Sequence, residues 1–126
     1  MTIAQKIGWA LSGLFALFML GASALPKLAG MAVATDIMAQ LGWPDAPIFL
    51  IGLIEAALAI LYLVPATSVL ASSLLMALLG GAVVTNLRGH ADLYGHTLFG
   101  VYLGIWLWGG LILRDPRVRA VFPLVR

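Results

Sequence analysis

The stretch from Ile48 to Val64 constrains the fold more than any other part of the chain. Its residues are apolar except for Glu55, with Gly52 and Tyr62 as mild exceptions, and a proline flanks it at each end. An apolar run of this length is at the short end of what crosses a bilayer as a helix. A carboxylate at that depth is costly and persists where it is paired or used. On a helix Gly52, Glu55 and Tyr62 fall on one side, so we expect Glu55 to face protein and not lipid.

Two interpretations of Glu55 stay open at this point. In the first it is a packing device, hydrogen-bonded to its neighbours or protonated and neutral. In the second it marks a site where a ligand binds or a proton moves, which is the default interpretation of an ionisable residue inside a membrane. We favour the second.

The composition indicates an integral membrane protein. Of 126 residues, 63% are hydrophobic and 10% are charged, and the mean hydropathy is +1.08. A soluble domain carries about 25% charged residues. The chain has no cysteine, which excludes thiolate chemistry, disulfides and cysteine-ligated metals from the chain itself. The basic residues do not form an interleaved patch, so we expect no nucleic-acid partner.

The hydrophobic pattern predicts an all-α, four-helix transmembrane bundle in one domain over residues 1–126. The predicted spans cover residues 7–25, 48–64, 69–86 and 97–113. A cleaved signal peptide is the rival interpretation of the first span, because Ala22-Ser23-Ala24 resembles a cleavage site. We expect a retained span that ends at Pro26.

The longest predicted loop lies between the first two spans. It contains a candidate short helix from Thr35 to Leu41, with Thr35 or Asp36 as its N-cap. Such a segment suits the membrane interface, and Trp43 after it is typical of an interfacial anchor.

Small residues recur at four-residue spacing on three of the spans, which lets helices approach closely. These ridges are Gly8/Ser12/Ala16, Ser73/Ala77/Gly81/Thr85 and Gly100/Gly104. We expect some of them to serve internal packing and the remainder to support a homodimer.

The distribution of Lys and Arg predicts that both termini are cytoplasmic. With that orientation the inside carries Lys6, Arg114, Arg117, Arg119 and Arg126, and the outside carries Lys27 and Arg88. This is the excess that the positive-inside rule requires. We expect the C-terminal arginines to contact lipid headgroups, and we expect the protein in the bacterial cytoplasmic (inner) membrane.

In this topology the polar residues of four helices converge on the outer half of the bundle, while the inner half is expected to be dry. Glu55 lies about 10 Å below the outer end of its helix. The residues predicted to bind a ligand there are Lys27, Glu55, Thr85, Asn86, Arg88, His90, His96 and Tyr102. Glu55 is the candidate catalytic residue, and Lys27, Asn86, Arg88 or His96 are its candidate partners. A metal site built from His90, His96 and Glu55 is a weaker alternative, and we predict none.

Several short motifs occur in an order that resembles the DoxX-like family of small four-span membrane proteins. They are SALPKL at residues 23–28, LGWP at 41–44, GLIE at 52–55, PAT at 65–67, GAVVTN at 81–86 and LRDP at 113–116. The resemblance covers nearly the whole chain and implies a four-helix membrane bundle. It also implies an association with quinone-linked redox systems, because the family is named from such subunits. The cysteines of some redox relatives are absent here.

Three functions follow as expectations. The first is an accessory protein that binds a quinone, a lipid or a similar amphipathic ligand in the outer-half pocket, beside a redox partner subunit. The second is a membrane enzyme that uses Glu55 as an acid or base. The third is a proton or small-solute transporter, ranked last because four spans leave little room for alternating access.

Overall fold

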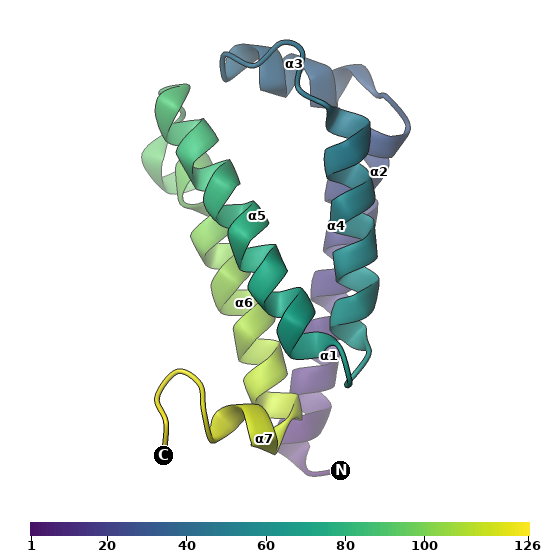
Figure 1. Cartoon of the computed structure of the whole chain (residues 1–126), viewed down its shortest axis with the longest axis vertical. Coiled ribbons are helices and arrows are strands. Elements are labelled where there is room, and N and C mark those ends of the chain that lie inside the picture. Colours follow the sequence, from purple (N-terminus) through teal and green to yellow (C-terminus); the bar gives the residue numbers. More distant parts are fainter.

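The computed structural model describes residues 1–126 and is all-helical. Four long helical segments run along one axis, and both termini lie at the same end (Figure 1). The segments are α1 (Ile3–Phe18) with η1 (Met19–Ala24) and α2 (Leu25–Leu28), then α4 (Ile48–Leu63), α5 (Ser68–Arg88), and η2 (Leu93–Thr97) with α6 (Phe99–Arg114). Two short helices, α3 (Ala32–Gln40) and α7 (Pro116–Arg119), lie at opposite ends of the bundle. We call the end with α3 the outer end and the end with both termini the inner end. The predicted all-α four-helix bundle is confirmed.

Three of the segments are long and apolar enough to cross a membrane, namely Ile3–Leu28, Ser68–Arg88 and Leu93–Arg114. The remaining segment, α4, is apolar but shorter, with 16 residues, so its length is about 24 Å. Large apolar side chains cover the outside of the bundle, among them Leu17, Phe49, Leu70 and Ile105. An outer surface of this kind suits lipid and not water.

The first helix continues past Pro26, where the sequence predicted its end, and stops at Leu28. The reason is the π-helical turn η1, in which the Leu25 N–H bonds to the Leu20 carbonyl, five residues back. A proline ring inside a helix clashes with the carbonyl four residues before it. The wider π turn directly before Pro26 makes room for the ring.

The short helix α3 also begins earlier than predicted, at Ala32, and neither Thr35 nor Asp36 caps it. Gly30, with φ of +65°, reverses the chain after the first helix. The new helix therefore starts at once, and the Thr35 hydroxyl bonds back to the Ala32 carbonyl at 3.0 Å. The helix lies across the outer end of the bundle (Figure 1).

Two of the small-residue ridges pack inside the bundle. A Cβ at Gly8 would lie 2.8 Å from the Gly110 carbonyl oxygen, so α1 and α6 meet backbone to backbone there. A Cβ at Gly100 would lie 2.9 Å from the Leu79 carbonyl oxygen, which brings α6 equally close to α5. These contacts are the close approaches that the small residues allow.

The third ridge, on α5, does not pack against another helix of the bundle. Ser73, Ala77 and Gly81 are exposed, and a Cβ at Gly81 would meet nothing within 4 Å. The packed face of α5 is formed instead by Ala71, Ser72, Leu75 and Leu79. The cause is the course of the helices, because α4 and α5 meet at the turn between them and diverge toward the outer end (Figure 1).

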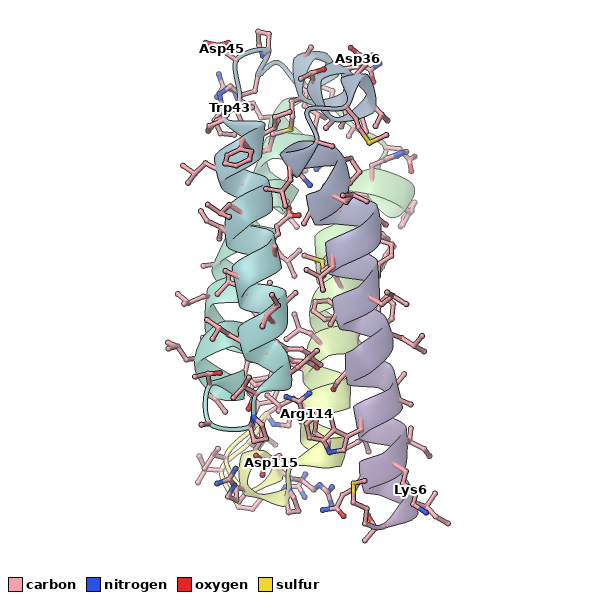
Figure 2. The ribbon with its side chains drawn as sticks, turned by 90° about the vertical axis from the view of Figure 1, so that its right-hand side faces the viewer. Lys6, Asp36, Trp43, Asp45, Arg114 and Asp115 are labelled. Atoms are coloured by element: carbon pink, nitrogen blue, oxygen red, sulfur yellow. The ribbon has the colours of Figure 1, made fainter.

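Contrary to the prediction, the inner half of the bundle contains a buried charged residue, Arg114. Its guanidinium lies over the rings of Trp9 and Tyr62, at 4.3 Å and 4.6 Å from their centroids. Its Nη2 donates to the Tyr62 carbonyl, and the Tyr62 hydroxyl contacts Ser12 at 3.1 Å. Figure 2 shows Arg114 pointing in among the helices, whereas Lys6 points outward. This cluster joins α1, α4 and α6 at the inner end.

The chain ends in polar contacts outside the bundle. The Asp115 carboxylate caps α7 and accepts hydrogen bonds from the Arg117 side chain at 3.1 Å and 3.0 Å. These bonds hold the pKa of Asp115 below its usual range. The interaction is exposed on the Arg117 side, so its contribution to stability is small.

Candidate ligand-binding site

Close packing between the first helix and α4 positions the site. Figure 2 shows these two segments side by side along the bundle. A Cβ at Gly52 would lie 2.8 Å from Lys27 Cβ and 3.1 Å from the Ala24 carbonyl oxygen. Glycine at this position therefore lets α4 approach the outer end of the first helix. One turn further along α4, Glu55 then faces Ser23 and Lys27, which stand one turn apart on the first helix.

Ser23, Lys27 and Glu55 form a closed hydrogen-bonded cluster. Lys27 Nζ lies 3.0 Å from Glu55 Oε1 and 3.3 Å from Oε2. The Ser23 hydroxyl donates to Glu55 Oε2 at 2.7 Å. Lys27 Nζ also donates to the Ser23 hydroxyl oxygen at 3.0 Å and to the Ser23 carbonyl at 3.1 Å. The prediction that Glu55 is paired is confirmed, with Lys27 as its partner.

The burial of this cluster makes the pairing energetically important. The side chains of Lys27 and Glu55 are 19% and 8% exposed. Removing one member of a buried ion pair leaves an uncompensated charge, which costs about 3–5 kcal/mol in proteins. The ion pair with Lys27 is therefore needed to keep the Glu55 carboxylate at this depth, independently of any role in ligand binding or catalysis.

A cavity of about 700 Å³ opens beside the cluster in the outer half of the bundle. All four long segments contribute to its wall, and α3 and Trp43 cover its outer end. Most of the wall is apolar, formed by side chains such as Phe18, Met19, Phe99 and Leu103. Ala77 and Gly81 of the α5 ridge also belong to it. The small residues of the ridge thus leave space for the cavity within the bundle.

Five of the eight predicted site residues line this cavity. They are Lys27, Glu55, Thr85, Asn86 and His96. The side chains of Thr85 and Asn86 bond within their own helix, to the carbonyls of Gly81 and Ala82, each at 2.8 Å. They therefore belong to the wall opposite Glu55 and do not contact it.

The other three predicted residues lie away from the cavity. Arg88 is exposed at the end of α5, and His90 is exposed in the turn that follows, with φ of +57°. The Tyr102 hydroxyl donates to the Tyr94 carbonyl at 2.8 Å on the outer surface of the bundle. Because His90 is remote, the alternative metal site does not assemble, and no group of three His, Cys, Asp or Glu residues is close enough to hold a metal ion.

Sequence reasoning missed two components of the site. Ser23 was interpreted only as part of a motif, although a hydroxyl one turn before Lys27 on a helix is a readable signal. The second missed component is the outer wall of the cavity. The sequence predicts Trp43 and the helix with Ile37 and Met38 at the membrane interface, whereas in the structure these three residues line the cavity. Only the position of α3 over the bundle reveals that role.

The apolar exterior and the buried ion pair together define a small helical integral membrane protein with a cavity in one half. A sequence model described as the DoxX-like family matches residues 10–110, and the chain belongs to that family. No curated protein and no solved structure gave a match to the chain.

Proposed function

We propose that this protein binds an amphipathic ligand, such as a quinone or a lipid, in the outer-half cavity. The observation that carries the proposal is the combination of a cavity of about 700 Å³, a mainly apolar wall and one buried polar cluster. Pockets for small molecules have this character, with apolar walls and a few fixed polar groups that orient the ligand. The ligand's polar head would lie at Ser23, Lys27 and Glu55, and its chain along Ala77 and Gly81.

The divergence of α4 and α5 supports access from the bilayer. Ala77 and Gly81 are exposed and line the cavity at the same time. An amphipathic molecule could therefore enter sideways from the outer half of the membrane. The orientation used here, with both termini in the cytoplasm, is the one that the positive-inside rule favours, and we place the protein in the bacterial cytoplasmic membrane.

The resemblance to the DoxX-like family is the basis for placing the protein beside a redox partner subunit. The chain has no cysteine, so thiol chemistry would belong to that partner. In this proposal the protein supplies binding and positioning for the ligand, and the partner carries out the electron transfer.

Native mass spectrometry of the protein, released from its membrane in mild detergent, tests the proposal. We expect a bound small molecule on the wild type that is lost in Gly81→Leu, because the new side chain extends into the cavity without a clash at its Cβ. Gly80→Leu is the matched control, since Gly80 is equally open at Cβ but does not line the cavity. An equal bound fraction in both variants would contradict the proposal.

A second candidate function is catalysis by Glu55. The observation in its favour is the 2.7 Å hydrogen bond from the Ser23 hydroxyl to the carboxylate, a distance at which a general base can take a proton. Glu55→Gln should then abolish turnover while the ligand stays bound. If Glu55→Gln loses the bound ligand as well as turnover, the result favours a role of Glu55 in binding alone.

A further inference from the structure

We infer that the head of the ligand carries a hydroxyl group and binds by donating a hydrogen bond to Glu55. This inference rests on the proposed function and narrows it to one ligand chemistry. Its basis is the count of hydrogen-bond donors and acceptors at the polar end of the cavity.

The donors of the cluster are all engaged within the protein. An ammonium group has three N–H donors, and Lys27 Nζ has three acceptors within reach, namely the Ser23 carbonyl, the Ser23 hydroxyl oxygen and the Glu55 carboxylate. The single O–H of Ser23 is donated to Glu55 Oε2. A ligand that can only accept would have to break one of these bonds.

The acceptors of the cluster are not exhausted. A carboxylate has about four acceptor positions. Glu55 Oε2 accepts hydrogen bonds from Ser23 and Lys27, whereas Oε1 is in ion-pair contact with Lys27 Nζ at 3.0 Å and accepts no hydrogen bond. Glu55 lines the cavity, so the open position on Oε1 is the place where a donor from the ligand can bind.

The opposite wall shows the same bias. The Thr85 hydroxyl is donated to the Gly81 carbonyl, and the Thr97 hydroxyl is donated to the Ala91 carbonyl. Both residues line the cavity. Asn86 has one N–H engaged with the Ala82 carbonyl and keeps its side-chain oxygen as an acceptor. The exceptions are the second N–H of Asn86, the His96 ring and the indole N–H of Trp43, which belong to other parts of the wall than the Ser23–Lys27–Glu55 cluster.

Charge decides between the kinds of donor. The Lys27–Glu55 pair is neutral as a unit. A positively charged ammonium head would be repelled by Lys27 about as strongly as it is attracted by Glu55. A negatively charged phosphate or carboxylate head would be repelled by Glu55. A neutral hydroxyl avoids both repulsions and still donates to a charged acceptor, which is among the stronger hydrogen bonds in proteins. An ester, an ether or the carbonyl of an oxidised quinone lacks the required donor.

Matched photoreactive probes test this inference. A long-chain alcohol and its methyl ether, each with the same diazirine in the chain, are compared at equal mole fraction in phosphatidylcholine nanodiscs containing the whole protein. Phosphatidylcholine has no hydrogen-bond donor in its head, so the bilayer does not compete. Labelling of peptides from the cavity wall is measured by mass spectrometry. We expect the alcohol to label about ten-fold more than the ether, the effect of one hydrogen bond to a charged group.

Two variants locate the effect. In Glu55→Gln the alcohol-to-ether ratio should fall toward one, because an amide offers its own donor to the ether. In Ser23→Ala the preference for the alcohol should fall by less than in Glu55→Gln, because the carboxylate remains as an acceptor while one N–H of Lys27 becomes free for the ether. If Glu55→Gln does not fold, the ratio in the wild type still decides the inference.

The outcomes separate this inference from the proposed function. Equal labelling of the cavity by alcohol and ether would overturn the hydroxyl inference and leave amphiphile binding intact. Absence of cavity labelling by either probe would overturn both. Competition by a monoacylglycerol and by an alkyl hydroquinone then shows which hydroxyl-bearing source binds more tightly, and either ranking supports the shared chemistry.

Discussion

At the scale of single residues, the protein contains two cations inside the bundle, Lys27 partly buried and Arg114 buried, that are held in different ways. Lys27 is held by a carboxylate in the outer half, whereas Arg114 is held by two aromatic rings and a carbonyl in the inner half. The pairing of Lys27 with Glu55 could be predicted, because a carboxylate at depth needs a partner and Lys27 ends the neighbouring span. The burial of Arg114 could not, because a cation at the end of a span is usually counted as a headgroup contact.

The role of the Lys27–Glu55 pair is testable by stability measurements. Lys27→Met should lower the free energy of unfolding by about 3 kcal/mol, since it leaves the Glu55 carboxylate buried without its counter-charge. The double variant Lys27→Met/Glu55→Leu should recover most of that loss, because no charge remains. Thermal unfolding in mild detergent, followed by circular dichroism, measures both. If the single variant is as stable as the double variant, the unpaired carboxylate of Glu55 does not lower the free energy of unfolding, and the predicted role of the pair is wrong.

At the scale of helices, the sequence predicted the number, order and approximate bounds of the spans, because apolar run length determines them. It failed where one element depends on another. The π turn η1 lets the first helix pass Pro26, and the ridge on α5 faces a cavity because α4 diverges from it. The hydrophobic periodicity of a single helix does not predict the angle at which it crosses another helix.

The contact between α1 and α6 gives a prediction at this scale. Gly8→Ala should destabilise the bundle by about 1–3 kcal/mol, because its Cβ would meet the backbone of α6 at Gly110 and neither helix can yield locally. Gly13→Ala on the same helix should be neutral or slightly stabilising, since nothing lies within 4 Å of its Cβ. Unfolding midpoints of the two variants, compared with the wild type, decide the matter; equal midpoints would contradict the packing described for α1 and α6.

At the scale of the whole molecule, the bundle is closed at the inner end and open at the outer end. The core around Phe15, Tyr62 and Leu107 is fully buried, and the cavity lies beyond it beneath α3. Two of the three small-residue ridges are used within the bundle. The predicted homodimer would therefore have to use the α5 ridge, the same surface that lines the cavity, so a second copy and a ligand would compete for it.

The orientation of the bundle in the membrane is a further prediction. The chain has no natural cysteine, so Asp45→Cys at the outer end and Leu124→Cys at the inner end serve as single labelling sites. Both positions are exposed, and Asp45 is seen at the α3 end in Figure 2. An impermeant maleimide added to intact cells should label the first variant and not the second, because the excess of Lys and Arg favours cytoplasmic termini. The reverse pattern would invert the topology.

The most direct test of ligand binding is an experimental density map of the protein in a lipid nanodisc, at a resolution that shows side chains. We predict an elongated non-protein density in the outer-half cavity, with its polar end within hydrogen-bond distance of Glu55 Oε1 and its chain along Ala77 and Gly81. A cavity closed by contact of α4 with α5, or filled by a helix from a second copy, would contradict the account.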